Sequence, residues 1–239
     1  MVTPKDASGP ASLLISLQLS DSAFPSGFYA MSHGLEGFHQ QGLVDGDTIG
    51  DLLEDILVRT AGPGDATALA RAHGAAVRQD WDHVAELDRL LFASKLNSEL
   101  RRSSTRSGRQ LIDIVSEAYA GTHGGDDIAT WAEWVRSRRT PGCQAIATGV
   151  CYAATGVAVE QAVVSDLFAF AISFAGAALR LRLTDHRSTQ KLLRRVQPVI
   201  EEVAADAVAR PEADIGGFTP VGDIMSAGHE RAPARLFTS

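Results

Sequence analysis

The sequence is poor in the residues that form covalent or metal cross-links. Its only cysteines are Cys143 and Cys151. On a shared helix they would lie about 12 Å apart along the axis, since an α-helix rises about 1.5 Å per residue. That separation is too large for a disulfide bond. We therefore expect neither a disulfide nor a metal ion held jointly by the two thiols.

Positive charge and aromatic residues are also scarce. The chain of 239 residues carries 22 Lys and Arg against 29 Asp and Glu, a net charge of −7. Because no overall basic field is present, nucleic acid is not an expected partner. Aromatic residues make up only 6% of the chain, whereas Ala and Leu abound, which favours helices packed closely on helices.

Secretory and membrane segments are not predicted. The apolar run at residues 13–19 is interrupted by Ser16 and Gln18, unlike the core of a signal peptide. The most apolar stretch, residues 162–183, contains Asp166 and two arginines. A membrane span of about 20 apolar residues tolerates such charges poorly. We expect a buried helix, no membrane partner and a cytoplasmic protein.

The motifs of common enzyme classes are missing as well. The sequence has no Gly-x-x-x-x-Gly-Lys-Ser/Thr loop to hold phosphate, so the chain should not hydrolyse GTP. It has no Gly-x-Ser-x-Gly turn for a nucleophilic serine, and no glycine-rich turn of a dinucleotide-binding domain. We therefore predict that the protein is not an enzyme.

The residues that are present predict an all-α fold. Apolar residues recur at helical spacing, as in residues 49–57 and 192–207, and the alternation that marks strands is absent. We predict that Gly62-Pro63-Gly64 ends one helix, that Asp65 starts the next, and that Asp47 caps the helix at residue 49.

The chain is predicted to form one globular domain of about eight to ten packed helices. We expect a mobile N-terminal arm at residues 1–10, the helical domain at 11–210, and a loop with a partner-binding tail at 211–239. Residues 162–183 are apolar nearly all round, which places this helix either in the core or at a subunit interface. It motivates the prediction of a homodimer.

The segment from Leu17 to Glu36 contains an unusual turn. Pro25 fixes its own backbone and disfavours helix at Phe24, and Gly27 can adopt conformations closed to other residues. Aromatic residues crowd around this turn, namely Phe24, Phe28 and Tyr29. A turn of this composition must be packed against another part of the molecule.

The same segment carries a family resemblance. Residues 24–36, Phe-Pro-Ser-Gly-Phe-Tyr-Ala-Met-Ser-His-Gly-Leu-Glu, resemble the N-terminal signature of the urease accessory protein UreF family. Residues 228–239, which contain Arg-Leu-Phe, resemble its C-terminal signature. Weaker similarity at residues 99–111 and 168–183 extends the resemblance over nearly the whole chain.

Two residues depart from the family pattern. Phe28 stands where the family usually has Gly or Ser, and Met31 where it usually has an aromatic residue or His. These departures concern the details of the turn. The fold that the resemblance implies is helical and homodimeric, in agreement with the composition and periodicity.

The resemblance implies a non-enzymatic scaffold for urease maturation. UreF-like proteins join UreD, also called UreH, and the GTPase UreG in the assembly that delivers nickel to apo-urease. The expected partners are therefore UreD/UreH, UreG and apo-urease, with no resident cofactor and with nickel passing transiently through the complex. Whether the chain itself contacts nickel or modulates the GTPase activity of UreG stays open.

The implied partner-binding residues lie in the two signatures: Tyr29, Ser32, His33, Glu36, His229, Glu230, Arg231, Arg235, Leu236 and Phe237. Tyr29 and Arg235 are the two that the resemblance links to recruitment of UreG. Leu236 and Phe237 are apolar residues near the chain end. Ordering such a tail costs roughly 1–2 kcal/mol per residue, so either a partner or the chain itself must cover them.

No metal site is predicted. His83 and Glu86 are spaced to face one ion on a predicted helix, and a solvated pair is the simpler interpretation. His33 is expected to form a hydrogen bond that steadies its turn, with transient contact to nickel as the alternative. Asp21 and Glu36 either cap helix ends or guide a cation. The alternative function, a helical metal-dependent enzyme, requires Glu-x-x-His motifs on two facing helices, and the sequence does not contain two such motifs.

A short basic run is the last candidate feature. Arg102, Arg106 and Arg109 share one side of a predicted helix at about residues 97–119, and Arg101 lies beside them. Two interpretations remain open at this point. The arginines form either a solvated face or a surface that docks an acidic partner.

Overall fold

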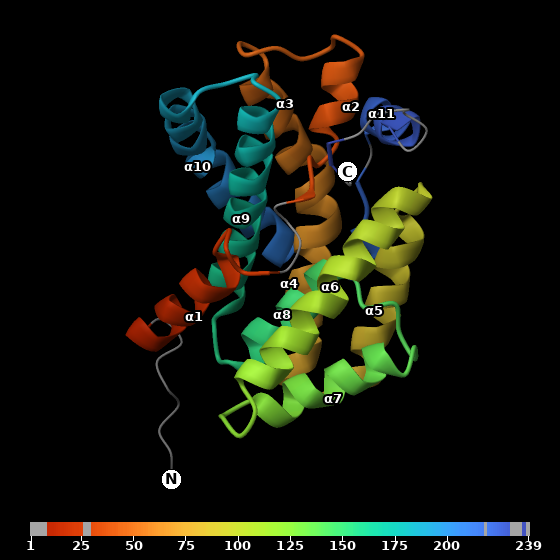
Figure 1. Cartoon of the computed structure of the whole chain (residues 1–239). Coiled ribbons are helices and arrows are strands. Elements are labelled where there is room, and N and C mark those ends of the chain that lie inside the picture. The colour runs from red at the N-terminus through yellow and green to blue at the C-terminus, as the bar shows by residue number, and fades with distance from the viewer. Residues whose placement is uncertain (1–8, 26–29, 218, 230–235, 238–239) are drawn as a thin grey trace.

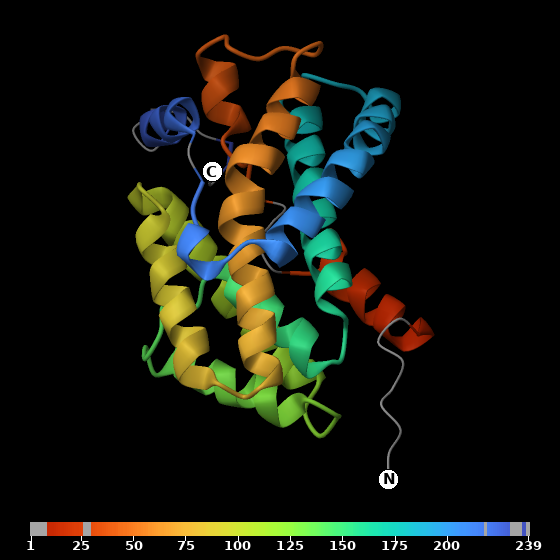
Figure 2. The same cartoon turned by 180° about the vertical axis from the view of Figure 1, so that it is seen from behind.

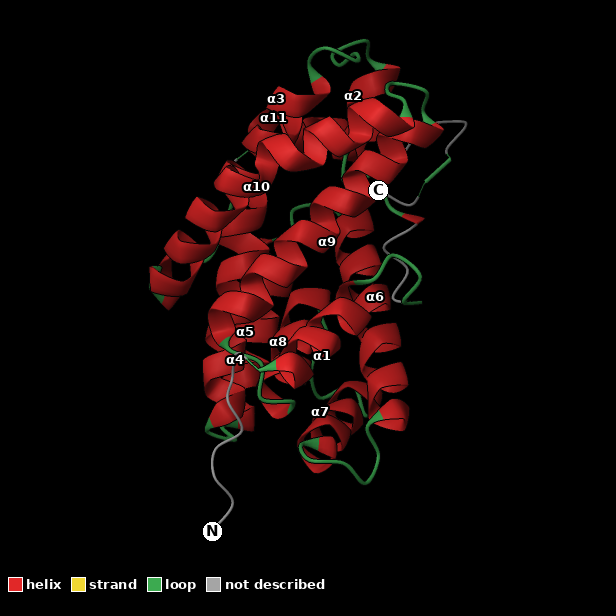
Figure 3. Cartoon of the chain, turned by 90° about the vertical axis from the view of Figure 1, so that its left-hand side faces the viewer, coloured by secondary structure: helices red, strands yellow, loops and turns green. Residues whose placement is uncertain are grey.

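The computed structural model describes residues 9–25, 30–217, 219–229 and 236–237 (Figures 1 and 3). These residues form helices and no strands, which confirms the predicted all-α class. The α-helices are α1 (Pro10–Ser20), α2 (Leu35–Gln40), α3 (Ile49–Ile56), α4 (Thr67–Val77), α5 (Trp81–Ser94), α6 (Ser98–Ala118), α7 (Gly125–Arg136), α8 (Gln144–Ala154), α9 (Val159–Arg180), α10 (His186–Ala209) and α11 (Pro220–His229). A π-helical segment, η2 (Leu57–Ala66), and a 3₁₀ turn, η3 (Glu212–Asp214), complete the described elements.

The helices α3, η2 and α4 run on without interruption as one rod. The prediction that Gly62-Pro63-Gly64 ends a helix and that Asp65 begins another is therefore wrong. The wider π-helical turn tolerates Pro63, whose carbonyl accepts a hydrogen bond from the Gly216 amide at 3.0 Å. A methyl group on Gly62 would lie 2.5 Å from Val203 Cγ1 of α10. Close packing on α10 thus outweighs the local preference to stop.

The start of α3 also differs from the prediction. Asp45, rather than Asp47, holds this helix start, because its carboxylate accepts hydrogen bonds from the Asp47 and Thr48 amides at 3.1 and 2.9 Å. Hydrogen bonding from Thr48 lowers the pKa of Asp45. Sequence alone did not distinguish two aspartates two residues apart.

The core is built around α8 and α9. Helix α8 packs between α4 and α6, and α9 packs along α10, with α1 on its other side (Figures 1 and 2). The largest fully buried side chains are Trp131, Tyr152 and Phe174. By length and composition α9 could cross a membrane. Its neighbours bury much of it inside the domain, so it serves here as the central core helix.

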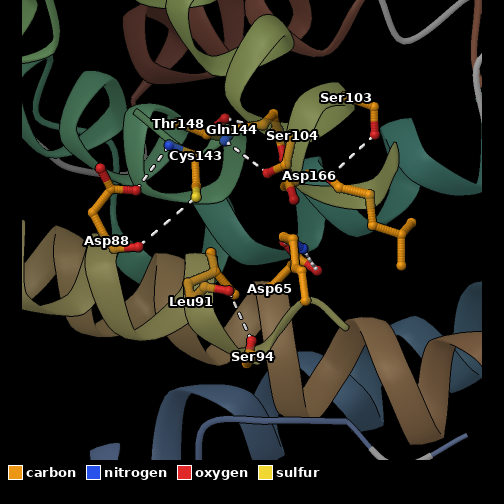
Figure 4. A network of polar contacts seen from close by, with 12 residues as sticks. Asp65, Asp88, Leu91, Ser94, Ser103, Ser104, Cys143, Gln144, Thr148 and Asp166 are labelled. Carbon is orange, nitrogen blue, oxygen red and sulfur yellow. Dashed lines mark hydrogen bonds and ion pairs between the residues drawn. The ribbon is translucent and has the colours of Figure 1, made fainter. Parts of the chain in front are cut away.

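A buried aspartate ties α5 to the loop between α7 and α8. Asp88 is fully buried, and its carboxylate accepts from Thr140 Oγ1 at 2.5 Å and from the Gly142 amide at 2.6 Å. It also accepts from the Cys143 amide at 2.8 Å (Figure 4). A methyl group on Gly108 of α6 would overlap the Gly142 carbonyl oxygen. Helices α5 and α6 therefore hold this loop firmly in place.

The C-terminal part is more ordered than predicted. Residues 220–229, which we expected to be loop and tail, form helix α11. Thr219 Oγ1 lies 2.9 Å from Thr60 Oγ1, and Asn97 Nδ2 donates to Ser226 Oγ at 2.9 Å. These side-chain contacts, at sequence separations of 159 and 129 residues, fix α11 on the rod and on α6.

Candidate partner-docking site

The fold brings the two signature segments together beside α2. The Glu36 carboxylate is almost fully buried and accepts hydrogen bonds from the amides of Leu236 and Phe237, at 2.9 and 3.1 Å. We refer to Ser32, His33, Glu36, Leu236 and Phe237 as the tail junction. Both carboxylate oxygens are used, so a single side chain holds the backbone of the chain end against the start of α2.

The two apolar residues at the chain end have different environments. Phe237 is 5% exposed, and the Arg180 guanidinium lies 4.4 Å from its ring centroid. A cation over an aromatic face stabilises the pair, the more so when partly desolvated. Leu236 is 74% exposed. Of the two interpretations left open, packing on its own subunit applies to Phe237, and Leu236 remains available to a partner.

His33 steadies the turn before α2, as predicted. Its Nε2 lies 2.9 Å from Ser173 Oγ, and its ring centroid lies 4.1 Å from that of Phe170, both on α9. His33 has a φ of +53°, which is uncommon outside glycine. Burial lowers the pKa of His33 to about 3. The ring is therefore neutral near pH 7 and acts through its hydrogen bond and packing.

Ser32 and Gly37 position α2 for these contacts. Ser32 is fully buried, and its hydroxyl accepts from the Glu36 amide at 3.4 Å. A methyl group on Gly37 would lie 2.9 Å from the Met225 carbonyl oxygen of α11. Glycine at this position allows α11 to lie directly against α2 (Figure 1). The tail junction is thus bordered by α2, α9 and α11.

A cavity of about 190 Å³ lies behind the tail junction. Met31 and His33 line it on one side, and Asp65, Lys95 and Asp166 contribute charge. Lys95 Nζ pairs with Asp65 Oδ1 at 2.8 Å. The cavity therefore combines an ion pair with one further buried carboxyl group.

Asp166 is the buried carboxyl group of this cavity wall. Gln144 Nε2 lies 2.8 Å from Asp166 Oδ1 and 2.9 Å from Thr148 Oγ1 (Figure 4). Burial raises the pKa of Asp166 to about 7, with a further contribution from the Asp65 charge. This group can therefore gain or lose a proton near neutral pH.

The metal-ligand candidates are used in other ways. Within the described residues no three His, Cys, Asp or Glu side chains are grouped to hold an ion. His83 Nε2 lies 2.8 Å from Glu212 Oε2 rather than pairing with Glu86. Asp21 accepts from the Ala23 amide at 2.6 Å in the turn after α1. Glu36, expected to cap a helix or guide a cation, instead binds the chain end.

Not every predicted site residue can be placed. Tyr29, Glu230, Arg231 and Arg235 lie outside the described residues. His229 is the last residue of α11, and its side chain is also outside the description.

The structure adds residues that sequence reasoning missed. Phe170, Ser173 and Arg180 come from α9 to the tail junction. The signal that could have identified Ser173 and Arg180 is their position in the mostly apolar C-terminal half of α9, because polar groups in such a helix usually have partners.

Fold and site together define a class: an all-α domain in which Glu36, near the start of α2, binds the backbone of residues 236 and 237. Comparison with known proteins then gives the family. A profile of the UreF family matches residues 43–197. This range excludes both terminal signatures, so it supports the family independently of them.

Curated relatives extend the match to nearly the whole chain. The chain is 33% identical over 230 residues to urease accessory protein UreF 2 of Brucella canis, covering 94% of this chain and 91% of that protein. It is 29% identical over 224 residues to urease accessory protein UreF of Yersinia enterocolitica, covering 93% and 96%. The chain belongs to the UreF family of urease accessory proteins.

Proposed function

We propose that this protein is a urease maturation scaffold that bridges UreD/UreH and the GTPase UreG in the complex that delivers nickel to apo-urease. The observation that carries the proposal is the Glu36 carboxylate, which joins the two signature segments into one surface. A chain end held in this way presents Leu236 to solvent at a fixed place. Because the backbone of this leucine is already ordered, a partner can bury its side chain with little further loss of conformational entropy.

The scaffold acts without chemistry of its own. Its contribution is geometric: UreD/UreH engages the surface around α2 and α11, and the same contact sets the chain end in the shape that UreG recognises. Nickel release is then controlled by the nucleotide on UreG. In this proposal the protein is cytoplasmic, needs no cofactor, and nickel passes through the assembly transiently. A role in modulating the GTPase activity of UreG is part of the same proposal.

The test is co-purification of this chain with UreD and UreG of the same source. We expect a stable ternary complex on size exclusion. Arg235→Ala, or truncation after Ala234, should abolish capture of UreG while far-UV circular dichroism keeps the helical signal. A truncated protein that still captures UreG as well as the full chain would contradict the role of the tail.

We also propose a homodimer, although α9 no longer motivates it. That helix lies in the core of its own chain. Leu13, Leu14 and Leu17 of α1 are instead more than half exposed, and an apolar strip of this kind favours association. A monomeric mass by light scattering at micromolar concentration would remove this part of the proposal.

A further inference from the structure

The basic run predicted on residues 101–109 is part of a larger cluster in the fold. Arg109 Nε donates to the Pro141 carbonyl at 3.2 Å, which places α6 beside the loop after α7. Arg106 lies one turn before Arg109 on the same side of α6. We define the arginine surface as six exposed residues on α5, α6 and this loop: Arg89, Arg102, Arg106, Arg109, Arg138 and Arg139.

The loop that completes the arginine surface is rigid. Asp88 binds the loop through Thr140, Gly142 and Cys143, and Arg89 follows Asp88 directly in α5. The Arg139 guanidinium lies 3.3 Å from the Trp134 ring centroid and pairs with Asp82 at 2.9 Å. Little order has to be created on binding, because the backbone that carries these arginines is already fixed.

Most of this positive charge is not neutralised by the protein itself. Among the described residues no carboxylate pairs with Arg89, Arg106, Arg109 or Arg138. The chain has more Asp and Glu than Lys and Arg, so these arginines are not unpaired for lack of carboxylates in the sequence. An acidic protein that keeps unpaired arginines side by side carries a local positive field that attracts opposite charge.

We propose that the arginine surface docks an acidic segment of a partner protein. Exposed apolar residues lie on or next to these helices: Leu90 on α5 is 41% exposed, and Leu96, in the connection between α5 and α6, is 69% exposed. Arginine and tryptophan are enriched at the centres of protein–protein contacts, and the exposed leucines add apolar area that a partner can cover. The partner segment should therefore combine Asp or Glu with a few apolar side chains.

Nucleic acid fits this surface less well. Acidic residues stand among the arginines: Asp82 pairs with Arg139, and Asp113 and Glu133 pair with Arg136. These carboxylates, together with the net charge of −7, would repel a continuous row of phosphates. A protein segment can place its own carboxylates between them. The inference is independent of the proposed function, since no residue of the tail junction belongs to the arginine surface.

The test uses the full chain and fluorescein-labelled poly-L-glutamate, followed by fluorescence anisotropy. The wild-type chain should bind, and binding should weaken as salt is raised. The variant R106E/R109E should bind at least about tenfold more weakly. The matched control is K191E/R194E on α10, which has the same spacing, exposure and change in net charge. It should stay within about twofold of the wild type.

Each result decides the proposal. Absence of wild-type binding would overturn it, because the positive field of the arginine surface would then be too weak to bind acidic chains. Equal loss of binding in both variants would also overturn it, because binding would then depend on the net charge and not on this surface. Tighter binding to duplex DNA than to poly-L-glutamate would overturn the choice of a protein partner. Circular dichroism and thermal unfolding check the fold of each variant. If R106E/R109E fails to fold, the neutral variant R106Q/R109Q decides, with a smaller expected loss.

Discussion

The hydrogen bonds from Glu36 to the chain end can be tested by replacing one carboxylate oxygen with an amide group. In Glu36→Gln the side chain keeps one acceptor oxygen, and its NH₂ group faces the second backbone amide. Both of these groups are hydrogen-bond donors, so that hydrogen bond is lost. Hydrogen bonds to a charged group contribute about 1.5–3 kcal/mol each. Loss of one should therefore cost about 2 kcal/mol of tail docking, or roughly a 30-fold lower docking equilibrium.

Hydrogen exchange in the full-length chain measures this loss directly. The amides of Leu236 and Phe237 are protected only while they donate to Glu36, so their protection should fall by roughly 30-fold in Glu36→Gln. Glu36→Ala, which removes both acceptors, should reduce protection further. The expected change is local, because the tail can open while the helices stay folded.

Glu201→Gln is the matched control. It makes the same chemical change on an exposed face of α10 and should leave both amides as protected as in the wild type. Equal protection in Glu36→Gln and Glu201→Gln would refute the reasoning. It would mean that packing of Phe237 holds the tail and that the Glu36 hydrogen bonds contribute little.

Two further predictions concern the buried aspartates. The pKa of Asp166 is raised to about 7 by burial, so at this group the folded state binds more protons than the unfolded state between about pH 4 and 7. The contribution of Asp166 to stability is therefore fully present below about pH 4 and is lost as pH rises through about 7. Asp166→Asn should remove this part of the pH dependence and raise the thermal midpoint at pH 8. Thermal unfolding at a series of pH values checks this, and parallel curves for both proteins would contradict it. Asp88→Asn leaves one acceptor oxygen for three donors. It should destabilise the protein by about 3 kcal/mol and lower the thermal midpoint by roughly 6–12 °C. An unchanged midpoint in calorimetry would argue against the importance of this buried hydrogen-bond network.

Local features of the sequence gave much of the helical architecture. Helix α6 was predicted at about residues 97–119 and spans Ser98–Ala118, with Asn97 accepting from the Leu100 amide at 2.8 Å at its start. Helix caps and apolar periodicity depend on residues that lie within a few positions of each other, so both can be recognised from the sequence alone.

The predicted helix boundaries were wrong where packing between residues distant in sequence determines the local structure. The rod continues through Pro63 because Val203 of α10 packs closely against Gly62 and because the Gly216 amide donates a hydrogen bond to the Pro63 carbonyl. Helix α11 forms at residues 220–229 where contacts from Thr60 and Asn97 hold it. Neither contact leaves a signal in the local sequence.

The candidate site shows the same division. The sequence by itself determined the all-α class, the absence of nucleotide-binding and nucleophile motifs, and the two terminal signatures. Only the tertiary structure decided that Glu36 receives the chain end, at a separation of 200 residues for Leu236, and that Phe237 is covered while Leu236 is not. The physical reason is that a carboxylate's partner and an apolar residue's cover are set by which elements meet in space, which depends on the packing of the whole domain.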